Sequence, residues 1–379
     1  MRIGIDARSI TEAQPSGIST YAVAVIQAMA QAAPDTEFVL FVSGRKLGQT
    51  VLLKQLQQQS NISWRHIQLP NKLFHGASVL QLMPAIEHWL GAIDVMFAPN
   101  WHILPLAQHT PLVVTVHDTS YQLYPQFLSW RRRAWHWAVQ PQHLLQRANE
   151  IIAVSHSTRQ AVLQQYHLSP RHVHTIYSGV PTLPAAAPIS VTLPLHYCAA
   201  LSTLEPRKNT LALVQAFIYF KQRHPTSQLA LVLMGQQGWK SRQLLRTITG
   251  QRDIYYLGYV TPAQKTYVLK QASWFMYPSI YEGFGFPPLE ALQLNCPVIA
   301  SWAGAIPEIL GQAAYYIDPY SITSIAHAIT TFEYDPAIRS QLLAAAPAVL
   351  ARYHWQRTAK ATLAVLQQAV YNTPHAHRH

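Results

Sequence analysis

Apolar and polar positions along the chain follow a repeating pattern in which a short apolar run is followed by a longer segment with helical spacing. Strands of parallel sheets are buried on both faces and read as continuous apolar runs, so this alternation predicts an α/β protein. The expected strands are residues 3–6, 38–42, 94–98, 112–116 and 151–154, and then 197–201, 229–234, 254–257, 274–277 and 298–300.

The segments between these runs carry helical periodicity, and the pattern starts again halfway along the chain. The expected helices are residues 19–31, 129–147 and 157–165, then 210–221, 241–247, 262–270 and 288–294, and finally 324–331, 337–351 and 355–369. The stretch from Pro181 to Pro188 is rich in proline and alanine and fits neither period, so we place a domain boundary there. We expect one domain over 1–182 and a second over 195–354.

Composition agrees with two soluble domains of ordinary size. The chain has 379 residues, 49% of them hydrophobic, and a formal net charge of +12. This charge favours anionic partners but does not separate nucleotides, nucleic acid and acidic lipid. The basic residues are scattered and no nucleic-acid motif occurs, so we expect no nucleic-acid partner. Two distant cysteines, Cys198 and Cys296, fit a reducing cytosol and exclude a four-cysteine zinc site.

Neither a signal-peptide pattern nor an apolar run of membrane-spanning length occurs in the sequence. We therefore expect a cytoplasmic protein, at most peripheral at the inner face of the membrane. The segment Trp130–Trp137 is the candidate for such contact, since arginine and tryptophan together suit an anionic interface. The alternative, which we favour, is a surface helix with solvated arginines and with tryptophans packed on the sheet.

The stretch from Tyr277 to Leu292 carries two glutamates, Glu282 and Glu290, separated by two glycines and a Pro-Pro pair. This predicts a strand, a tight loop and a helix from about Pro287, because proline is favoured in the first turn. A helix N-terminus is a natural anion site. We expect Glu290 in the first turn of this helix, where its carboxylate can accept hydrogen bonds from both hydroxyls of a ribose.

A second cluster, Arg207 and Lys208, lies between a predicted strand and a predicted helix. Ligands of open α/β sheets bind beyond the carboxyl ends of the strands. A guanidinium fork beside a lysine ammonium suits a diphosphate. The alternative is a solvated basic loop in which Glu205 is a local ion-pair partner.

The stretch from Glu282 to Glu290 resembles the E-x(7)-E signature of retaining group-1 (family 4) glycosyltransferases. Matches continue through Asn295–Ser301, Pro307–Ile309, Gly311–Ala314 and Asp318–Pro319, with Asn295 and Gln312 where that family usually has Gly and Asp. The resemblance implies a GT-B fold, with two Rossmann-like domains facing a central cleft. It also implies that the helix from Trp355 onward returns to the N-terminal domain, which would bind the acceptor.

The same resemblance assigns roles to the residues of the donor half. Glu290 would hold the ribose and Glu282 would bind donor-sugar hydroxyls, while Arg207 and Lys208 stabilise the departing diphosphate. The sugar and the phosphates would be lined by the backbone of Gly283, Phe284 and Gly285. No Asp-x-Asp triplet occurs in the sequence. We therefore expect neither a metal nor another cofactor, with the basic residues replacing the cation.

In the first half, His117 and Asp118 end a predicted strand and resemble the family's N-domain histidine near the reaction centre. His117 would donate a hydrogen bond to sugar or phosphate, and Asp118 would orient it or meet the acceptor. A strand end with a satisfied histidine is the alternative for this pair. Gly17 and Tyr21 match the family's glycine-rich loop, in which the backbone of Gly17 approaches the donor phosphate.

These observations predict a retaining hexosyltransferase that uses a nucleoside diphosphate sugar and a hydroxyl acceptor, a glycan or a lipid-linked glycan. The combined motifs look most like bacterial mannosyltransferases of surface polysaccharide or glycolipid assembly, which points to GDP-mannose. UDP-glucose is the alternative donor. A nucleotide-sugar epimerase would instead turn over its substrate without an acceptor, and a scaffold that has lost turnover would bind nucleotide without forming product.

Overall fold

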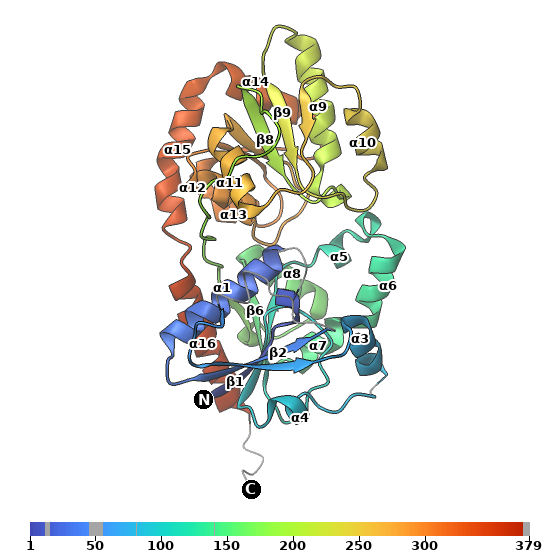
Figure 1. Ribbon diagram of the computed structural model, residues 1–379, viewed down its shortest axis with the longest axis vertical. Coiled ribbons are helices and arrows are strands. Elements are labelled where there is room, and N and C mark those ends of the chain that lie inside the picture. The colour runs from blue at the N-terminus through green and yellow to red at the C-terminus, as the bar shows by residue number, and fades with distance from the viewer. Residues whose placement is uncertain (12–15, 45–55, 81, 140, 374–379) are drawn as a thin grey trace. The chain divides into compact units, whose positions relative to one another are not determined.

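The structure, a computed structural model, describes residues 1–11, 16–44, 56–80, 82–139 and 141–373 (Figure 1). Its contacts divide the chain into two compact units. Unit 1 comprises Met1–Thr119, Arg131–Gly179 and Tyr353–His379, and unit 2 comprises Ser120–Trp130 and Val180–Arg352. The acceptor-binding and donor-binding roles expected for the two domains stay predictions.

Unit 1 is built on a seven-stranded, fully parallel sheet of order β3-β2-β1-β4-β5-β6-β7. The strand order reverses between β1 and β4, which makes this pair the topological switch point of the sheet. The strands are β1 (Arg2–Asp6), β2 (Glu37–Ser43), β3 (Ile62–Ile67), β4 (Val95–Ala98), β5 (Leu112–Val116), β6 (Glu150–Ala153) and β7 (Val173–Thr175). The helices include α1 (Gly17–Ala32), α3 (Asn71–Val79), α4 (Glu87–Leu90), α6 (Trp130–Val139), α7 (Pro141–Arg147) and α8 (His156–Tyr166).

The last helix, α16 (Trp355–Asn372), packs within unit 1 beside α1 and against β4, β5 and β6 (Figure 1). Thr358 Oγ1 donates to the carbonyl of Tyr177 at 2.7 Å. The buried Glu150 of β6 accepts hydrogen bonds from Gln368 and Asn372. The predicted return of the C-terminal helix to the N-terminal domain is therefore confirmed.

Unit 2 has a six-stranded parallel sheet of order β10-β9-β8-β11-β12-β13, with its switch point between β8 and β11. The strands are β8 (Tyr197–Leu201), β9 (Ala230–Met234), β10 (Ile254–Tyr256), β11 (Trp274–Tyr277), β12 (Val298–Ser301) and β13 (Ala314–Ile317). The helices are α5 (Ser120–Leu123), α9 (Thr210–Arg223), α10 (Arg242–Ile248), α11 (Pro262–Gln271), α12 (Phe286–Gln293), α13 (Ile306–Leu310), α14 (Ile322–Tyr334) and α15 (Pro336–Leu350).

Several elements were not expected from the sequence, namely the strands β3, β7 and β13 and the short helices α3, α4, α5 and α13. β3 is an edge strand whose residues are only half-buried, so its sequence lacks a continuous apolar run. The helix expected over 129–147 corresponds to α6 and α7, and residue 140 between them lies outside the described residues.

The arginine- and tryptophan-rich segment forms the start of α6. Trp130 is 74% exposed and Trp135 is 40% exposed, so the expectation that these tryptophans pack on the sheet is wrong. Among the helices that the structure describes, none combines the length and apolar character that crossing a bilayer requires.

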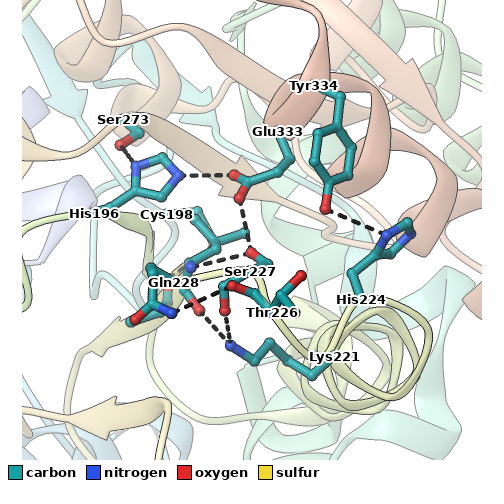
Figure 2. Close-up of polar contacts among 12 residues, drawn as sticks. His196, Cys198, Lys221, His224, Thr226, Ser227, Gln228, Ser273, Glu333 and Tyr334 are labelled. Atoms are coloured by element: carbon teal, nitrogen blue, oxygen red, sulfur yellow. Dashed lines mark hydrogen bonds and ion pairs between the residues drawn. The ribbon is translucent and has the colours of Figure 1, made fainter.

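A polar network lies within unit 2, where the end of α14 meets the start of β8 and the loop after α9 (Figure 2). Glu333 accepts hydrogen bonds from His196 Nε2 and Ser227 Oγ, both at 2.7 Å. The other ring nitrogen of His196 contacts Ser273 at 2.9 Å. The hydroxyl of Tyr334, the next residue, lies 3.3 Å from Nδ1 of the half-buried His224.

This network leads to a stability prediction for two neighbouring residues. Glu333→Ala removes a largely buried acceptor with two partners, so we expect unfolding to become easier by about 1–3 kcal/mol. Tyr334→Phe changes a side chain on a residue that is 57% exposed and should shift stability by no more than about 0.5 kcal/mol. Urea unfolding followed by fluorescence measures both variants. Equal midpoints for the two would show that the network contributes nothing.

Candidate active site

The carboxyl ends of β8 and β11 lie side by side at the switch point of unit 2, where open α/β sheets bind ligands. The strand β8 leads to a short 3-10 turn, Pro206–Lys208, and β11 leads to the loop that precedes α12. Two hydrogen bonds join these segments. The N–H of Ile280 donates to the carbonyl of Arg207, and Arg207 Nη1 donates to the carbonyl of Tyr281, both at 2.8 Å. The structure therefore brings together the two strongest sequence motifs.

Glu282 is at the centre of an ion cluster formed by these segments. One of its oxygens accepts from Lys208 Nζ at 2.6 Å, and the other accepts from Arg207 Nη1 at 2.9 Å. Arg207 also donates from Nη2 to Glu205 at 2.9 Å. The three charged partners and Glu282 all have side chains that are mostly buried. Two cations and two carboxylates therefore balance in a weakly solvated place, where their interactions are stronger than at the surface.

The cluster fixes the ionisation state of Glu282. Burial alone would raise the pKa of this carboxyl, but the charges of Lys208 and Arg207 lower it to about 2. Because the folded-state pKa lies below the ordinary value of 4.5, this carboxylate stabilises the fold above about pH 4.5. That contribution is lost as the pH falls from about 4.5 towards 2. Glu282 is thus an anion at neutral pH, and both of its oxygens are engaged.

The basic side chains retain capacity for an anionic ligand. A lysine ammonium carries three N–H donors. Lys208 makes one hydrogen bond within the described part of the chain, and its ammonium lies 5.7 Å from the centre of the Tyr277 ring. Arg207 is 17% exposed at its side chain, beside the same loop. The alternative of a solvated basic loop does not fit, because both side chains are mostly buried and ion-paired.

The helix α12 begins at Phe286, one residue before the expected start, because Gly285 adopts a left-handed conformation with φ 103° and caps the helix. Glu290 is therefore outside the first turn, and the prediction that it lies there is wrong. Glu290 is buried and accepts a hydrogen bond from Lys265 Nζ of α11 at 2.5 Å. This partner, which the sequence analysis did not identify, holds the carboxylate of Glu290 in one position.

Residues on either side of the loop hold its backbone in place. Phe284 is buried, and its ring packs edge-to-face on Phe286 with a centroid separation of 5.3 Å. Gly283, next to Phe284, is buried as well. Ser301 Oγ donates to the carbonyl of Ser279 at 2.5 Å and ties the loop to β12.

Two further residues that sequence reasoning missed position the same loop. Asn209, in a left-handed conformation, donates through its amide to the carbonyls of Pro278 and Pro319 and so joins the ends of β11 and β13. The residue after Gly304, Ala305, donates its N–H to the carbonyl of Glu282 at 2.9 Å. Gly304 itself has φ +61°, and a Cβ there would lie 2.6 Å from that carbonyl oxygen. A positive φ beside a backbone contact is not visible in a single sequence.

In unit 1, His117 follows β5 and is partly buried. Its Nε2 lies 2.8 Å from the carbonyl of Pro99, which can only accept, so Nε2 carries the proton. Burial lowers the pKa of His117, and the contact to Pro99 and the charge of Asp118 only partly offset this effect. The imidazole is therefore neutral at pH 7. Its Nδ1 then carries a lone pair, so this atom can accept a hydrogen bond but cannot donate one.

Gly17 is the first residue of α1, and its position is set by a capping box. Ser16 Oγ accepts from the N–H of Ser19 at 3.2 Å, and Ser19 Oγ accepts from the N–H of Ser16 at 2.7 Å. Tyr21 is buried and packs edge-to-face on His117 at 4.7 Å. The loop with Gly17 is thus connected through α1 to the histidine.

The two Rossmann-like units with parallel sheets have the architecture of the GT-B class of glycosyltransferases. Residues 15–182 match the family described as Glycosyltransferase Family 4, and residues 196–348 match Glycosyl transferases group 1. The chain belongs to this glycosyltransferase family, and the protein is a glycosyltransferase.

Relatives and solved structures agree with this assignment. O-antigen chain mannosyltransferase B of Escherichia coli is 29% identical over 347 residues, which cover 77% of this chain and 89% of that protein. O-antigen chain mannosyltransferase RfbU of Salmonella typhimurium is 24% identical over 281 residues, covering 71% of this chain and 77% of that protein. The crystal structure of Anabaena HepE in complex with UDP and glucose has a TM-score of 0.68 at 17% identity and covers 97% of this chain and 100% of its own. This last likeness shows the fold.

Proposed function

We propose that the protein is a retaining mannosyltransferase that moves mannose from GDP-mannose to a hydroxyl of a glycan or lipid-linked glycan. The observation that carries the proposal is the ion cluster around Glu282, at the point of the unit 2 sheet where ligands bind. The choice of mannose is supported by the names of the two curated relatives, both O-antigen chain mannosyltransferases. Assembly of a surface polysaccharide is the process that fits these relatives.

Each side chain of the site has a role in this reaction. Glu290, held by Lys265, accepts hydrogen bonds from the ribose hydroxyls, and Glu282 accepts them from hydroxyls of the donor sugar. Arg207 and Lys208 contact the diphosphate and stabilise the charge that develops as it leaves. Because these two cations supply the positive charge, the reaction needs no metal ion.

The state of Glu282 supports front-face departure and attack over a covalent intermediate. A carboxylate whose pKa is lowered to about 2, with each oxygen bonded to a cation, is a weak nucleophile. In the front-face course, the bond from the anomeric carbon to phosphate breaks and the acceptor oxygen forms its bond on the same side. The proton of the acceptor hydroxyl leaves to the departing phosphate, and the anomeric configuration is retained.

Unit 1 would contribute the acceptor-binding part of the reaction. His117 offers its Nδ1 lone pair to a sugar hydroxyl, Asp118 lies beside it, and the backbone at Gly17 approaches the donor phosphate. A peripheral contact with an anionic membrane surface through the start of α6 would bring the enzyme to a lipid-linked acceptor, and the protein would work at the cytoplasmic side.

Calorimetry with GDP, GDP-mannose, UDP and UDP-glucose, with EDTA present, tests the donor part of this proposal. We expect the two guanosine nucleotides, GDP and GDP-mannose, to bind. Glu290→Ala should weaken binding by about 10- to 100-fold, because hydrogen bonds to a charged group are lost. Glu290→Gln, which keeps the shape of the side chain, should show a smaller loss. The matched control is Lys270→Ala, an exposed residue on the same helix as Lys265, which should bind as wild type.

Binding of uridine nucleotides alone would contradict the choice of GDP-mannose and leave a UDP-sugar transferase. Equal nucleotide binding by wild type and Glu290→Ala would remove the ribose role of Glu290.

A further inference from the structure

The switch point of unit 1 has its own cluster of polar side chains, and the proposed roles of His117, Asp118 and Gly17 do not use it. Asp6 ends β1, Arg8 follows in a 3-10 turn, and His102 follows β4, the strand next to β1. His75 of α3 packs against His102 with a ring separation of 5.7 Å. These four residues, here termed the Asp6 cluster, lie beyond the carboxyl ends of β1 and β4, where open α/β folds bind ligands.

A buried ion pair forms the base of the Asp6 cluster. Arg8 donates from Nε and Nη2 to the two oxygens of Asp6, both at 2.8 Å, and both side chains are almost fully buried. The guanidinium also lies 5.0 Å from the centre of the Phe74 ring. Burial would raise the pKa of Asp6, but Arg8 and His102 lower it far below the usual range. Asp6 is thus an anion and Arg8 a cation, so the pair is neutral overall.

Asp6 also fixes the orientation and tautomer of His102. The Nδ1 atom of His102 lies 3.0 Å from Asp6 Oδ2. An ionised carboxylate only accepts hydrogen bonds, so Nδ1 must carry a proton. In the neutral ring, Nε2 then has a lone pair. Nε2 makes no hydrogen bond with the residues that the structure describes, and the side chain of His102 is 13% exposed. The dyad therefore presents one oriented acceptor atom towards solvent.

Several polar atoms around this dyad lack a partner. Arg8 Nη1, His75 Nδ1 and Asn100 Oδ1 are shielded from solvent and form no hydrogen bond across the described ranges of the chain. Buried polar groups in proteins nearly always have hydrogen-bond partners. Three buried polar atoms without a partner at the carboxyl ends of β1 and β4 therefore call for an explanation. Arg8 is 2% exposed, which makes its unpaired N–H costly without a ligand or ordered solvent nearby.

The charges of the cluster select the kind of ligand. Burial and the charge of Arg8 lower the pKa of His75 to about 4, so this ring is neutral at pH 7. Because the charges of Asp6 and Arg8 cancel and the ring of His75 is neutral, the cluster presents no net positive charge to a phosphate when His102 is neutral. A sugar, which presents several neutral hydroxyls, matches the cluster better than an anion does.

We propose that the Asp6 cluster is the subsite for a neutral sugar of the acceptor, in which Nε2 of His102 accepts a hydrogen bond from a sugar hydroxyl. Asp6 and Arg8 fix the imidazole from behind, and His75 forms a second wall of the subsite. This inference rests on the proposed function, because it names the part of the acceptor that unit 1 recognises. The acceptor would then be bound through a pyranose ring, whatever group lies at its far end.

The test is binding of methyl glycosides of mannose, glucose, galactose and N-acetylglucosamine to the full chain, followed by saturation-transfer NMR. GDP is present at saturation so that the donor site in unit 2 does not contribute. We expect at least one methyl glycoside to bind wild type and His102→Ala to weaken that binding at least tenfold. His109→Ala, which changes an exposed histidine in the same part of unit 1, is the matched control and should bind as wild type.

Calorimetric GDP affinity and the melting temperature separate this inference from a failure of fold or of donor binding. His102→Ala should keep both, since the imidazole is partly exposed. Loss of GDP affinity together with glycoside binding would show a role in folding and would overturn the proposal. Unchanged glycoside binding in His102→Ala would also overturn it, as would the absence of glycoside binding to wild type. Displacement of the glycoside from GDP-saturated enzyme by inorganic pyrophosphate would show that the subsite binds an anion instead of a neutral sugar.

Discussion

Arg207→Ala should lower kcat/KM by about 100- to 1000-fold, the usual effect of removing one preorganised donor to a developing charge. The same change deletes the partner of Glu282 and Glu205 and the hydrogen bond to the Tyr281 carbonyl. Glu282 then remains buried with Lys208 as its cation. The expected loss therefore combines weaker stabilisation of the leaving diphosphate with a displaced loop. Initial rates over a range of donor concentrations measure it.

Two further variants show which part of the loss belongs to charge. Arg207→Lys keeps the charge but not the planar fork, so an intermediate loss is expected. Arg223→Ala removes an exposed arginine whose guanidinium lies over the Tyr219 ring, at the other end of α9, and should stay within about twofold of wild type. Activity of Arg207→Ala within about fivefold of wild type would contradict the role of the ion cluster.

The Gly304→Ala variant should lose most of its activity, although the new side chain does not contact the donor. A Cβ at this position would lie 2.6 Å from the carbonyl oxygen and 2.9 Å from the nitrogen of Glu282, so the loop must move. A shift of about 1 Å at a reacting site is enough to lower the rate about 100-fold. The new side chain must also adopt φ +61°, which is strained for an L-residue by about 1–2 kcal/mol.

Gly250→Ala separates backbone strain from the displacement of Glu282. Gly250 has φ +81° in the same unit, and no atom lies within 4 Å of a Cβ placed there. Gly250→Ala should lose about 1–2 kcal/mol of stability in urea unfolding from backbone strain alone, and Gly304→Ala should lose at least as much. Only Gly304→Ala should lose kcat. Equal activities of the two variants would show that Gly304 does not position Glu282.

Much of the fold follows from the alternation of apolar runs and helical segments. Strands such as β5 and β11 are buried on both faces, so their sequences are continuously apolar and were located to the residue. The edge strand β3 includes Arg65 and His66, and its half-buried positions carry no such signal.

The candidate site was only partly predictable, because its key contacts join residues far apart in the chain. The motifs with Glu282 and with Arg207 were recognised separately, as a sugar contact and a phosphate contact. The ion pair between them spans 75 positions and appears only once β8 and β11 are neighbours. The partner of Glu290, Lys265, comes from another helix. Glu290 also lies later in its helix than expected, since Gly285 moved the start.

The Asp6 cluster illustrates the same limit in unit 1. Asp6 and His102 are 96 positions apart and were unremarkable singly in a chain with 19 histidines. Strand order makes them neighbours, because β1 and β4 meet where the sheet reverses. The sequence shows only an acidic residue and a histidine near the ends of two predicted strands, and this pattern gains meaning only once the two strands are known to be neighbours.

The most direct test of the account is the reaction itself, followed by NMR with EDTA present. GDP-mannose and UDP-glucose are each incubated with the enzyme and with octyl glycosides of mannose and N-acetylglucosamine as acceptors. GDP-mannose carries an α-linked mannose, so retention predicts an α-mannoside from this donor and no product from UDP-glucose. A β-linked product, transfer from UDP-glucose alone, or activity that appears only when a divalent cation is added would contradict the account.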